Sequence, residues 1–197
     1  MAKTKAEKIT SIEEEIRQLE NRRRQLVQEQ KAQERKDRTK RLCRRMGLFE
    51  SLGAHNTIYS HWNVPDGMNA DEVREKAATC EHYLLSANGL AETGEIINID
   101  GTGNRVSSSL YGHKKVWFVV GSNKIAPTYD EALWRARNIA APKNAQRLGV
   151  KTPCAVNGDR CYDCKSPQRI CRGLVVLWEA IRSCETEVVL VDEPLGY

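Results

Sequence analysis

Four cysteines are concentrated within 18 residues near the end of the chain. They are Cys154, Cys161, Cys164 and Cys171, spaced C-x6-C-x2-C-x6-C. Two thiolates separated by two residues hold one ion from a single turn, and two more from flanking positions complete a four-sulfur shell suited to zinc or an iron-sulfur cluster. Reduced thiols with a structural or redox role, and disulfides, are the alternatives. The spacing favours a metal or cluster site.

Two further turns combine glycine with a cation, and each follows an apolar run. The first is Asp100-Gly101-Thr102-Gly103-Asn104-Arg105, and the second is Gly121-Ser122-Asn123-Lys124. Glycines let the backbone approach a ligand closely, N–H groups at a helix start favour an anion, and arginine holds a carboxylate or phosphate with two hydrogen bonds. The first turn is not a dinucleotide fingerprint, because its third glycine is missing.

The position of these turns after apolar runs also indicates a ligand site. Open α/β sheets bind their ligands outside the carboxyl ends of the strands. The alternatives are a tight turn with an ion-paired or surface Arg105 and a solvated Lys124. The predicted ligand-binding residues are Asp100, Gly101, Gly103, Asn104, Arg105, Asn123 and Lys124.

The elements that must position these residues form an α/β domain, predicted over residues 53–197. Short apolar runs alternate with turns and helical stretches, and the five apolar residues 116–120 are typical of a strand covered on both faces. Capping boxes at Asn69 with Glu72 and at Thr128 with Glu131 predict two helix starts. The predicted strands are 83–86, 96–99, 116–120 and 188–191, and the apolar run 174–181 fits either a helix or a strand.

Residues 1–52 differ in composition and are predicted to form a basic helical arm. Ile9, Ile12, Ile16, Leu19 and Leu26 fall on coiled-coil core positions, which is under three heptads. Residues 1–46 contain 15 Lys and Arg against 8 Asp and Glu, whereas the rest of the chain contains 16 against 18. The arm is therefore a candidate for self-association. A solvated helix is the alternative, and the lack of an interleaved reading face argues against nucleic acid as the partner.

Length and composition limit the size of the domain and the cellular compartment in which the protein is expected. The 197 residues suffice for one medium domain and an appendage, and no stretch approaches the roughly 18 apolar residues of a membrane span. The first residues run into charge without an apolar segment, so they do not resemble a secretory signal. We therefore expect a cytoplasmic protein, in which seven cysteines, an odd number, favour ligation or plain thiols over a disulfide framework.

Several longer motifs resemble the LUD family, named for lactate utilisation. They are the runs Asn98–Val106, Lys114–Val116, Val120–Ile125, Arg137–Pro142, Thr152–Cys154, Ser166–Cys171 and Leu190–Tyr197. The resemblance covers roughly residues 70–197, or from Gly47 at its widest. Residues 38–52 also resemble small, charged coiled-coil proteins encoded near mobilisation functions on plasmids of Gram-positive bacteria.

The resemblance implies a fold related to the sugar-phosphate isomerases and CoA transferases, with a parallel sheet that is partial here, and a role in utilising lactate or similar organic acids. The branch with the cysteine cluster is typical of anaerobic bacteria. The family normally begins with another helix and strand carrying a glycine-rich segment, in place of which this chain has its basic arm. We therefore expect either an organic-acid protein with a four-cysteine site, or a catalytically inactive assembly or nucleic-acid-binding protein driven by the arm.

Overall fold

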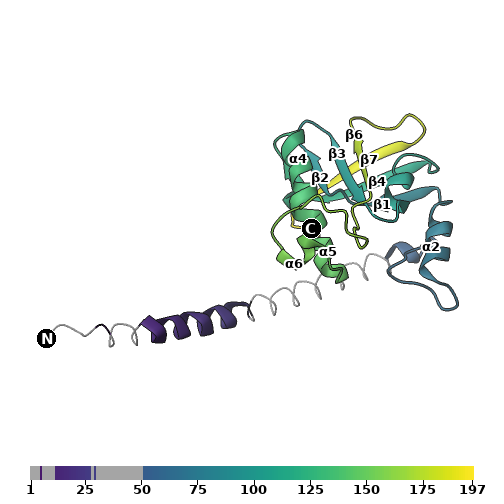
Figure 1. The fold of residues 1–197 in the computed structure, drawn as a ribbon. Helices are drawn as coiled ribbons and strands as arrows, with labels where there is room; N and C mark the ends of the chain where they lie inside the picture. The colour runs from purple at the N-terminus through teal and green to yellow at the C-terminus, as the bar shows by residue number, and fades with distance from the viewer. Residues whose placement is uncertain (1–4, 6–11, 28, 30–50) are drawn as a thin grey trace. The chain divides into compact units, whose positions relative to one another are not determined.

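The computed structural model describes residues 5, 12–27, 29 and 51–197 (Figure 1). By its internal contacts the chain divides into two compact units, residues 1–58 and 59–197. In the first unit, residues 12–27 form a helix, and residues 51–53 are helical as well. The predicted helical arm, residues 1–52, is thus helical at 12–27 and 51–53, while residues 30–50, which contain many of its Lys and Arg residues, lie outside the described residues.

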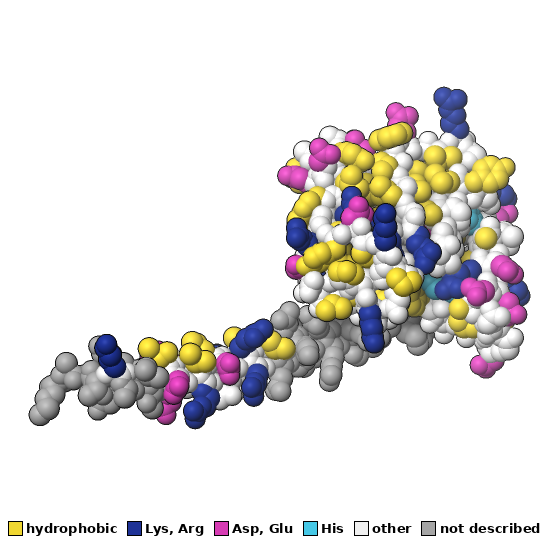
Figure 2. Space-filling model, viewed as in Figure 1, with side chains coloured by type: hydrophobic (Ala, Val, Ile, Leu, Met, Phe, Trp, Pro, Cys, Tyr) yellow, Lys and Arg dark blue, Asp and Glu magenta, His cyan; other side chains and the backbone are white. Residues whose placement is uncertain are grey.

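The helix 12–27 has an apolar side that is open to solvent within its unit. Figure 2 shows a row of hydrophobic side chains along it, with charged side chains on the other side. The exposed fractions of these side chains range from 41% to 69%, and the residues are Ile12, Ile16, Leu19, Leu26 and Val27. An exposed stripe of this kind agrees with the heptad spacing in the sequence.

The second unit contains a three-stranded parallel sheet with the strand order β1-β4-β7. Its strands are β1 (His82–Leu85), β4 (Lys115–Gly121) and β7 (Glu185–Val191). The central strand β4 pairs in parallel with both neighbours, so that Phe118 lies opposite Leu85 on one side and Val188 on the other. The predicted strands 83–86, 116–120 and 188–191 all fall in this sheet, which confirms the parallel sheet.

A second sheet has four strands in the order β5-β2-β3-β6. Its strands are β2 (Gly89–Ala91), β3 (Ile96–Asp100), β5 (Ile125–Ala126) and β6 (Gly173–Leu177). The predicted strand 96–99 was expected in the same sheet as the others, and this was wrong, because β3 runs antiparallel to both β2 and β6 in the second sheet. The apolar run 174–181, which fitted either a helix or a strand, contributes to strand β6. Only four residues join β2 to β3, which permits a hairpin but not a parallel crossover.

The helices follow the local capping signals. Helix α2 (Ala70–Ala77) begins with the complete capping box of Asn69 and Glu72. Helix α4 (Tyr129–Arg135) begins where the Thr128 side chain accepts a hydrogen bond from the Glu131 N–H, and it continues through a π-helical turn (Ala136–Ala140) into α5 (Ala141–Leu148). The remaining short helices are α3 (Asn104–Ser108), the 3-10 turn Ser122–Lys124 and α6 (Pro153–Asn157).

The two cores show how these layers are stacked. Val116, Phe118 and Val120 on the parallel sheet pack with Leu90, Ile96 and Leu177 on the second sheet, and all six side chains are buried. A second cluster joins the other face of the second sheet to the helical layer and consists of Ala91, Ile97, Ala126, Ala132 and Ala136. The second sheet is therefore the middle layer. In β4, buried residues alternate with partly exposed ones, so the expectation that this strand is covered on both faces was wrong.

Candidate ligand and cysteine sites

The turn after β3 is organised around the carboxylate of Asp100, whose side chain is 9% exposed. One oxygen accepts hydrogen bonds from the backbone N–H groups of Gly101 and Thr102, at 2.7 and 3.2 Å. The other oxygen accepts from the N–H of Arg105 at 3.1 Å and lies 3.6 Å from its Nε. Asp100 therefore fixes the turn from inside, which is a structural task.

Arg105 is held by the same turn. Its guanidinium donates to the Ile99 carbonyl oxygen at 2.7 Å and to the buried Asn98 side chain at 3.4 Å, in addition to its ion pair with Asp100. All three guanidinium nitrogens thus have protein partners. This arrangement agrees better with the alternative in which Arg105 is ion-paired within the protein than with a guanidinium that makes two hydrogen bonds to a ligand.

Asn104 faces the parallel sheet. Its side-chain amide donates to the Tyr83 hydroxyl at 3.5 Å, and the Tyr83 ring lies 4.9 Å from the buried ring of His113. Burial raises the pKa of Tyr83, an effect that hydrogen bonds with Asn104 and Ser108 partly offset. Tyr83 therefore stays protonated near neutral pH, so its hydroxyl is a neutral donor and acceptor beneath this turn.

Both glycines of this turn are needed, for different reasons. A Cβ on Gly101 would lie 2.5 Å from the backbone oxygen of Ile170, so the loop before β6 approaches too closely for any side chain. Gly103 has a φ of 95°, a left-handed conformation that other residues adopt only with strain. Glycine here therefore brings two backbone segments together; the same freedom was expected to admit a ligand.

The turn after β4 contains the most buried cation of the predicted set. Lys124 is only 5% exposed, and its ammonium group donates to the Ser86 hydroxyl at 2.9 Å, just beyond the end of β1. The neighbouring Asn123 bonds through its side chain to the backbone of residues 195 and 196, which follow β7. This turn therefore joins the carboxyl ends of all three parallel strands, which is the predicted location for a ligand in an α/β sheet.

Arg135 is a functional candidate that the sequence reading did not select. It is 9% exposed, and its guanidinium donates to the backbone oxygens of Asn123 at 2.8 Å and Asn88 at 2.6 Å. Burial lowers the pKa of Arg135. The available sequence signal was the small residues Ala132 and Ala136 close to it on the same helix, and the structure shows that both are fully buried.

Hydrogen bonds connect the two turns in the structure. The Ile99 carbonyl accepts from Arg105, and the Ile99 N–H donates to the Asn88 side chain at 2.8 Å. The Asn88 carbonyl then accepts from Arg135, which also donates to Asn123. The residues Asp100–Arg105 gather around the Asp100 carboxylate, and Asn123 and Lys124 gather at the end of β4, so the predicted ligand residues form two linked clusters.

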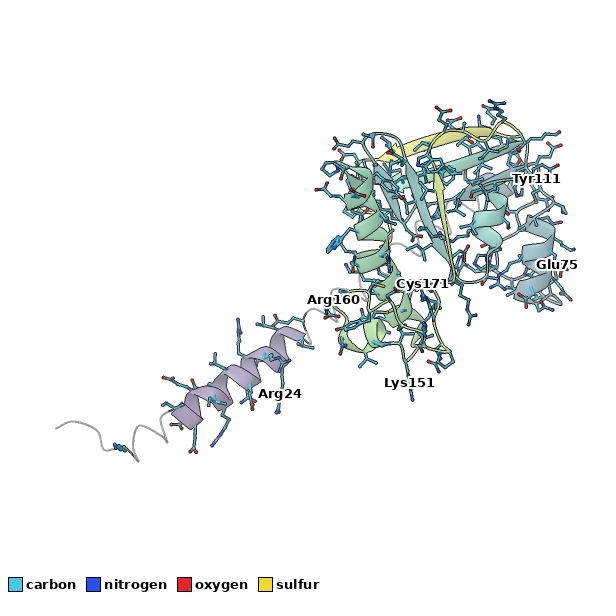
Figure 3. The ribbon with its side chains drawn as sticks, turned by 45° about the horizontal axis from the view of Figure 1, so that its top comes forward. Arg24, Glu75, Tyr111, Lys151, Arg160 and Cys171 are labelled. Carbon is cyan, nitrogen blue, oxygen red and sulfur yellow. The ribbon has the colours of Figure 1, made fainter. Side chains whose placement is uncertain are left out.

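The four clustered cysteines lie where the sequence placed them, between α5 and β6. Cys154 is in α6 and the other three are in the following loop, and all four are free thiols of intermediate exposure. Figure 3 places Cys171, Arg160 and Lys151 in the part of the unit that contains α5 and α6, and Glu75 and Tyr111 on the opposite side. The quartet is therefore separate from the α2 side of the domain.

Several polar groups already contact these sulfurs. The sulfur of Cys161 accepts from the N–H of Asp163 at 3.4 Å and lies 3.9 Å from an Arg137 guanidinium nitrogen. The Thr152 hydroxyl lies 3.2 Å from the sulfur of Cys154, whereas Arg169 donates to the backbone oxygens of Cys171 and Cys164 at 2.8 and 2.9 Å. Donors of this kind suit thiolates.

The fit of the loop to a metal can be examined directly. Among the described residues, no group of three or more His, Cys, Asp or Glu side chains is arranged to hold a metal ion. The sulfur donor set suits zinc or an iron-sulfur cluster, but the four thiols do not converge on one point as they stand. The four-sulfur site at Cys154, Cys161, Cys164 and Cys171 thus stays a prediction from their spacing.

Comparison with known proteins identifies the family. The sequence matches the LUD domain over residues 3–191, nearly its whole length. The chain belongs to the LUD domain family. The LUD match begins at residue 3, within the arm. The motifs recognised in the sequence begin only at about residue 70. The absence of the family's first helix and strand stays a prediction.

No curated protein and no solved structure matches this LUD-domain chain. In the part of the chain that the structure describes, none of the helices has the length and apolar character needed to cross a membrane. The α/β architecture and the family membership are thus the two established points from which a function is inferred.

Proposed function

We propose that this LUD-domain protein acts in the cytoplasm in the utilisation of lactate or a related organic acid and binds a small organic anion at the carboxyl end of β4. The observation that supports this proposal is Lys124, a 5% exposed cation at the point where three parallel strands end. A buried ammonium group attracts a carboxylate more strongly than an exposed one, because little water screens the charge. The Asp100–Arg105 turn supports the site by fixing β3 and, through Asn88 and Arg135, the backbone of Asn123.

The proposal is tested by titrating the protein with sodium lactate in a calorimeter. Lys124→Met keeps the length of the side chain and removes its charge, and we expect it to weaken lactate binding at least about tenfold, the factor that corresponds to about 1.4 kcal/mol. Lys114→Met is the matched control, because the Lys114 side chain is 74% exposed. Equal affinity in the Lys124→Met and Lys114→Met variants would contradict this site.

We further propose that the cysteine quartet holds zinc or an iron-sulfur cluster. An iron-sulfur cluster would supply one-electron chemistry, whereas zinc would staple the loop. Cys161 and Cys164 would hold the ion from one turn, and Cys154 and Cys171 would close the shell from either side. Arg137 and Arg169, which already contact this loop, would compensate the negative charge of the thiolates.

Anaerobic purification followed by visible absorption and metal analysis tests this assignment. Iron with sulfide and a brown colour would identify a cluster, and zinc alone a structural site. We expect Cys164→Ser to lower the metal content and Cys80→Ser, outside the quartet, to leave it unchanged. A protein without bound metal, or a loss of metal in both variants, would contradict the quartet as the site.

A second function is favoured by the exposed apolar side of the helix 12–27. We propose it as an alternative in which the arm drives assembly and the LUD domain is catalytically inactive. The double variant Ile16→Asp with Leu19→Asp places charge in the apolar stripe, and Glu13→Ala with Glu20→Ala is the control. Sedimentation of the full chain, with DNA binding measured over a range of salt concentrations, separates the two functions. An oligomeric state that does not change would overturn the assembly role.

A further inference from the structure

The segment that follows β7, residues 192–197, folds back over the end of β4. We call this segment the strap. The N–H of Leu195 donates to the Asn123 side-chain oxygen at 3.0 Å, and the Asn123 side-chain amide donates to the Gly196 carbonyl at 3.2 Å. One asparagine thus holds the strap through both halves of its amide.

Gly121 lets the strap approach this closely. A Cβ at this position would lie 2.5 Å from the Leu195 nitrogen and 2.7 Å from the Glu193 oxygen, both of which are backbone atoms. The φ of Gly121 is −76°, a value that any residue adopts. The Asn123 side-chain oxygen would lie 2.8 Å from the same Cβ. The strap and the side chain that holds it, and not the backbone conformation, therefore require glycine here.

The strap lies directly against the amine of the proposed ligand site. A Cβ built on Gly196 would lie 3.5 Å from the ammonium nitrogen of Lys124. Lys124 is 5% exposed, although it follows a strand end, where side chains are usually open to solvent. Access to this ammonium group thus depends on whether the strap is in place.

The attachment of the strap is weaker than that of the sheet it covers. Val191 is the last residue of β7 that pairs with β4, and the strap itself belongs to neither sheet. Leu195, Gly196 and Tyr197 are only partly buried. Segments with few buried contacts open more readily than the strands of a core, so the strap can lift while the sheet stays folded.

We propose that the strap is a gate over the anion site at Lys124 and that Asn123 is its latch. This inference rests on the proposed function in that it takes Lys124 as the group that meets the ligand. A small carboxylate enters when the latch opens, and reclosure of the strap shields the ion pair from water, which strengthens the attraction between the two charges.

The gate is tested without a ligand, through the reactivity of the Lys124 amine. The full-length protein is treated briefly with acetic anhydride, and acetylation of Lys124 is compared with that of the exposed Lys114 by mass spectrometry. Asn123→Ala removes both latch bonds, and Leu195→Pro removes only the N–H donor. We expect Leu195→Pro to raise acetylation of Lys124 about fivefold, the shift in population that follows from the loss of one typical hydrogen bond. Asn123→Ala loses two such bonds and should raise it further.

Two controls separate gating from general loosening. Leu195→Ala shortens the side chain and keeps the N–H. Acetylation of Lys124 should therefore be much lower in Leu195→Ala than in Leu195→Pro. Hydrogen exchange of the β4 amides reports on opening of the sheet. Unchanged labelling in both latch variants would overturn the gate, and so would a matching rise in exchange along β4.

Lactate distinguishes failure of the gate from failure of the ligand site. In the wild-type protein, saturating lactate should slow acetylation of Lys124 and leave Lys114 unchanged. If the latch variants expose Lys124 but lactate gives no protection, the strap controls access and lactate is not the ligand. If lactate protects Lys124 and the latch variants do not expose it, the site is correct and the gate is overturned.

Discussion

The turns after β3 and β4 have similar sequences and different tasks. Each combines glycine, asparagine and a cation, and each follows a buried strand. In the first turn the cation, Arg105, is bound by its own turn and by β3. In the second turn the cation, Lys124, lies under a separate segment whose backbone is hydrogen-bonded to the side chain of Asn123.

The two cations differ in where along the chain their contacting residues come from. Arg105 has partners that come from residues 98–100 of the same hairpin, so its contacts form as soon as β3 and α3 form. The cover of Lys124 comes from residues more than 70 positions later, through a segment outside both sheets. We therefore infer that the first turn is a rigid support and the second turn is the adjustable site.

We expect the largest effect when the free energy of unfolding is compared between a substitution in the first turn and one in the second. Asp100→Ala leaves three backbone N–H groups without their acceptor and removes the ion-pair partner of the Arg105 Nε, and we expect it to lower the free energy of unfolding by about 2–4 kcal/mol. Asn123→Ala removes two neutral hydrogen bonds of the strap and should cost at most about 1–2 kcal/mol. Urea denaturation measures both, and equal losses would remove the distinction between support and gate.

Two glycine substitutions should also affect the two turns differently. An added Cβ meets backbone at 2.5 Å in both Gly101→Ala and Gly121→Ala. Gly101→Ala pushes against the loop that leads into β6, so we expect a loss of about 1–3 kcal/mol in the free energy of unfolding. Gly121→Ala displaces the strap and the Asn123 side chain that holds it, and its main effect should be faster acetylation of Lys124.

Gly173→Ala is the control for this pair, because nothing lies within 4 Å of its added Cβ. Its stability should stay within about 0.5 kcal/mol of the wild type, as is usual for surface positions. The comparison would be contradicted if Gly121→Ala destabilised the sheet as much as Gly101→Ala does.

The smallest expected effect concerns pH and the surroundings of Arg105. Burial and the nearby charges of Arg74 and Arg105 lower the pKa of His61 from its ordinary value of 6.5. The folded state therefore resists protonation, and stability that is complete above pH 6.5 is lost as the pH falls from 6.5 towards the lowered pKa. His61→Gln should reduce this loss, measured as unfolding free energies at pH 7.5 and 5.5.

The exposed His82 provides the control for the pH prediction. His82→Gln should keep the wild-type loss of stability between pH 7.5 and 5.5. The same loss in the His61→Gln variant as in the wild type would mean that His61 does not contribute to this pH dependence.

Much of the fold could be predicted from the sequence, because its signals are local. The Asn69–Glu72 capping box, the Thr128 cap and the apolar run of β4 each depend on residues within a few positions, and the structure has all three. The second sheet was missed because β2 has only three residues and β5 only two. Strands this short leave no periodic pattern to read.

The sequence predicted residues of the candidate site, Asn123 and Lys124 among them, but not how they are arranged or covered. Lys124 follows an apolar strand, and this order placed it at the carboxyl edge of the sheet. Its cover by the strap depends on where β7 pairs with β4, and the role of Arg135 depends on the contact of α4 with Asn88 and Asn123. Long-range pairings of this kind have no signature at either residue alone.

Residue type and local order were enough to predict the family, the α/β class, the strands of the parallel sheet and the metal-like spacing of the cysteine quartet. Three other features became visible only in the folded chain: Asp100 and Arg105 pair with each other, Lys124 is buried, and residues 192–197 lie over the end of β4. Burial and hydrogen bonding between distant segments arise only when the layers pack, so a turn of similar sequence becomes a support or a gate according to what packs against it.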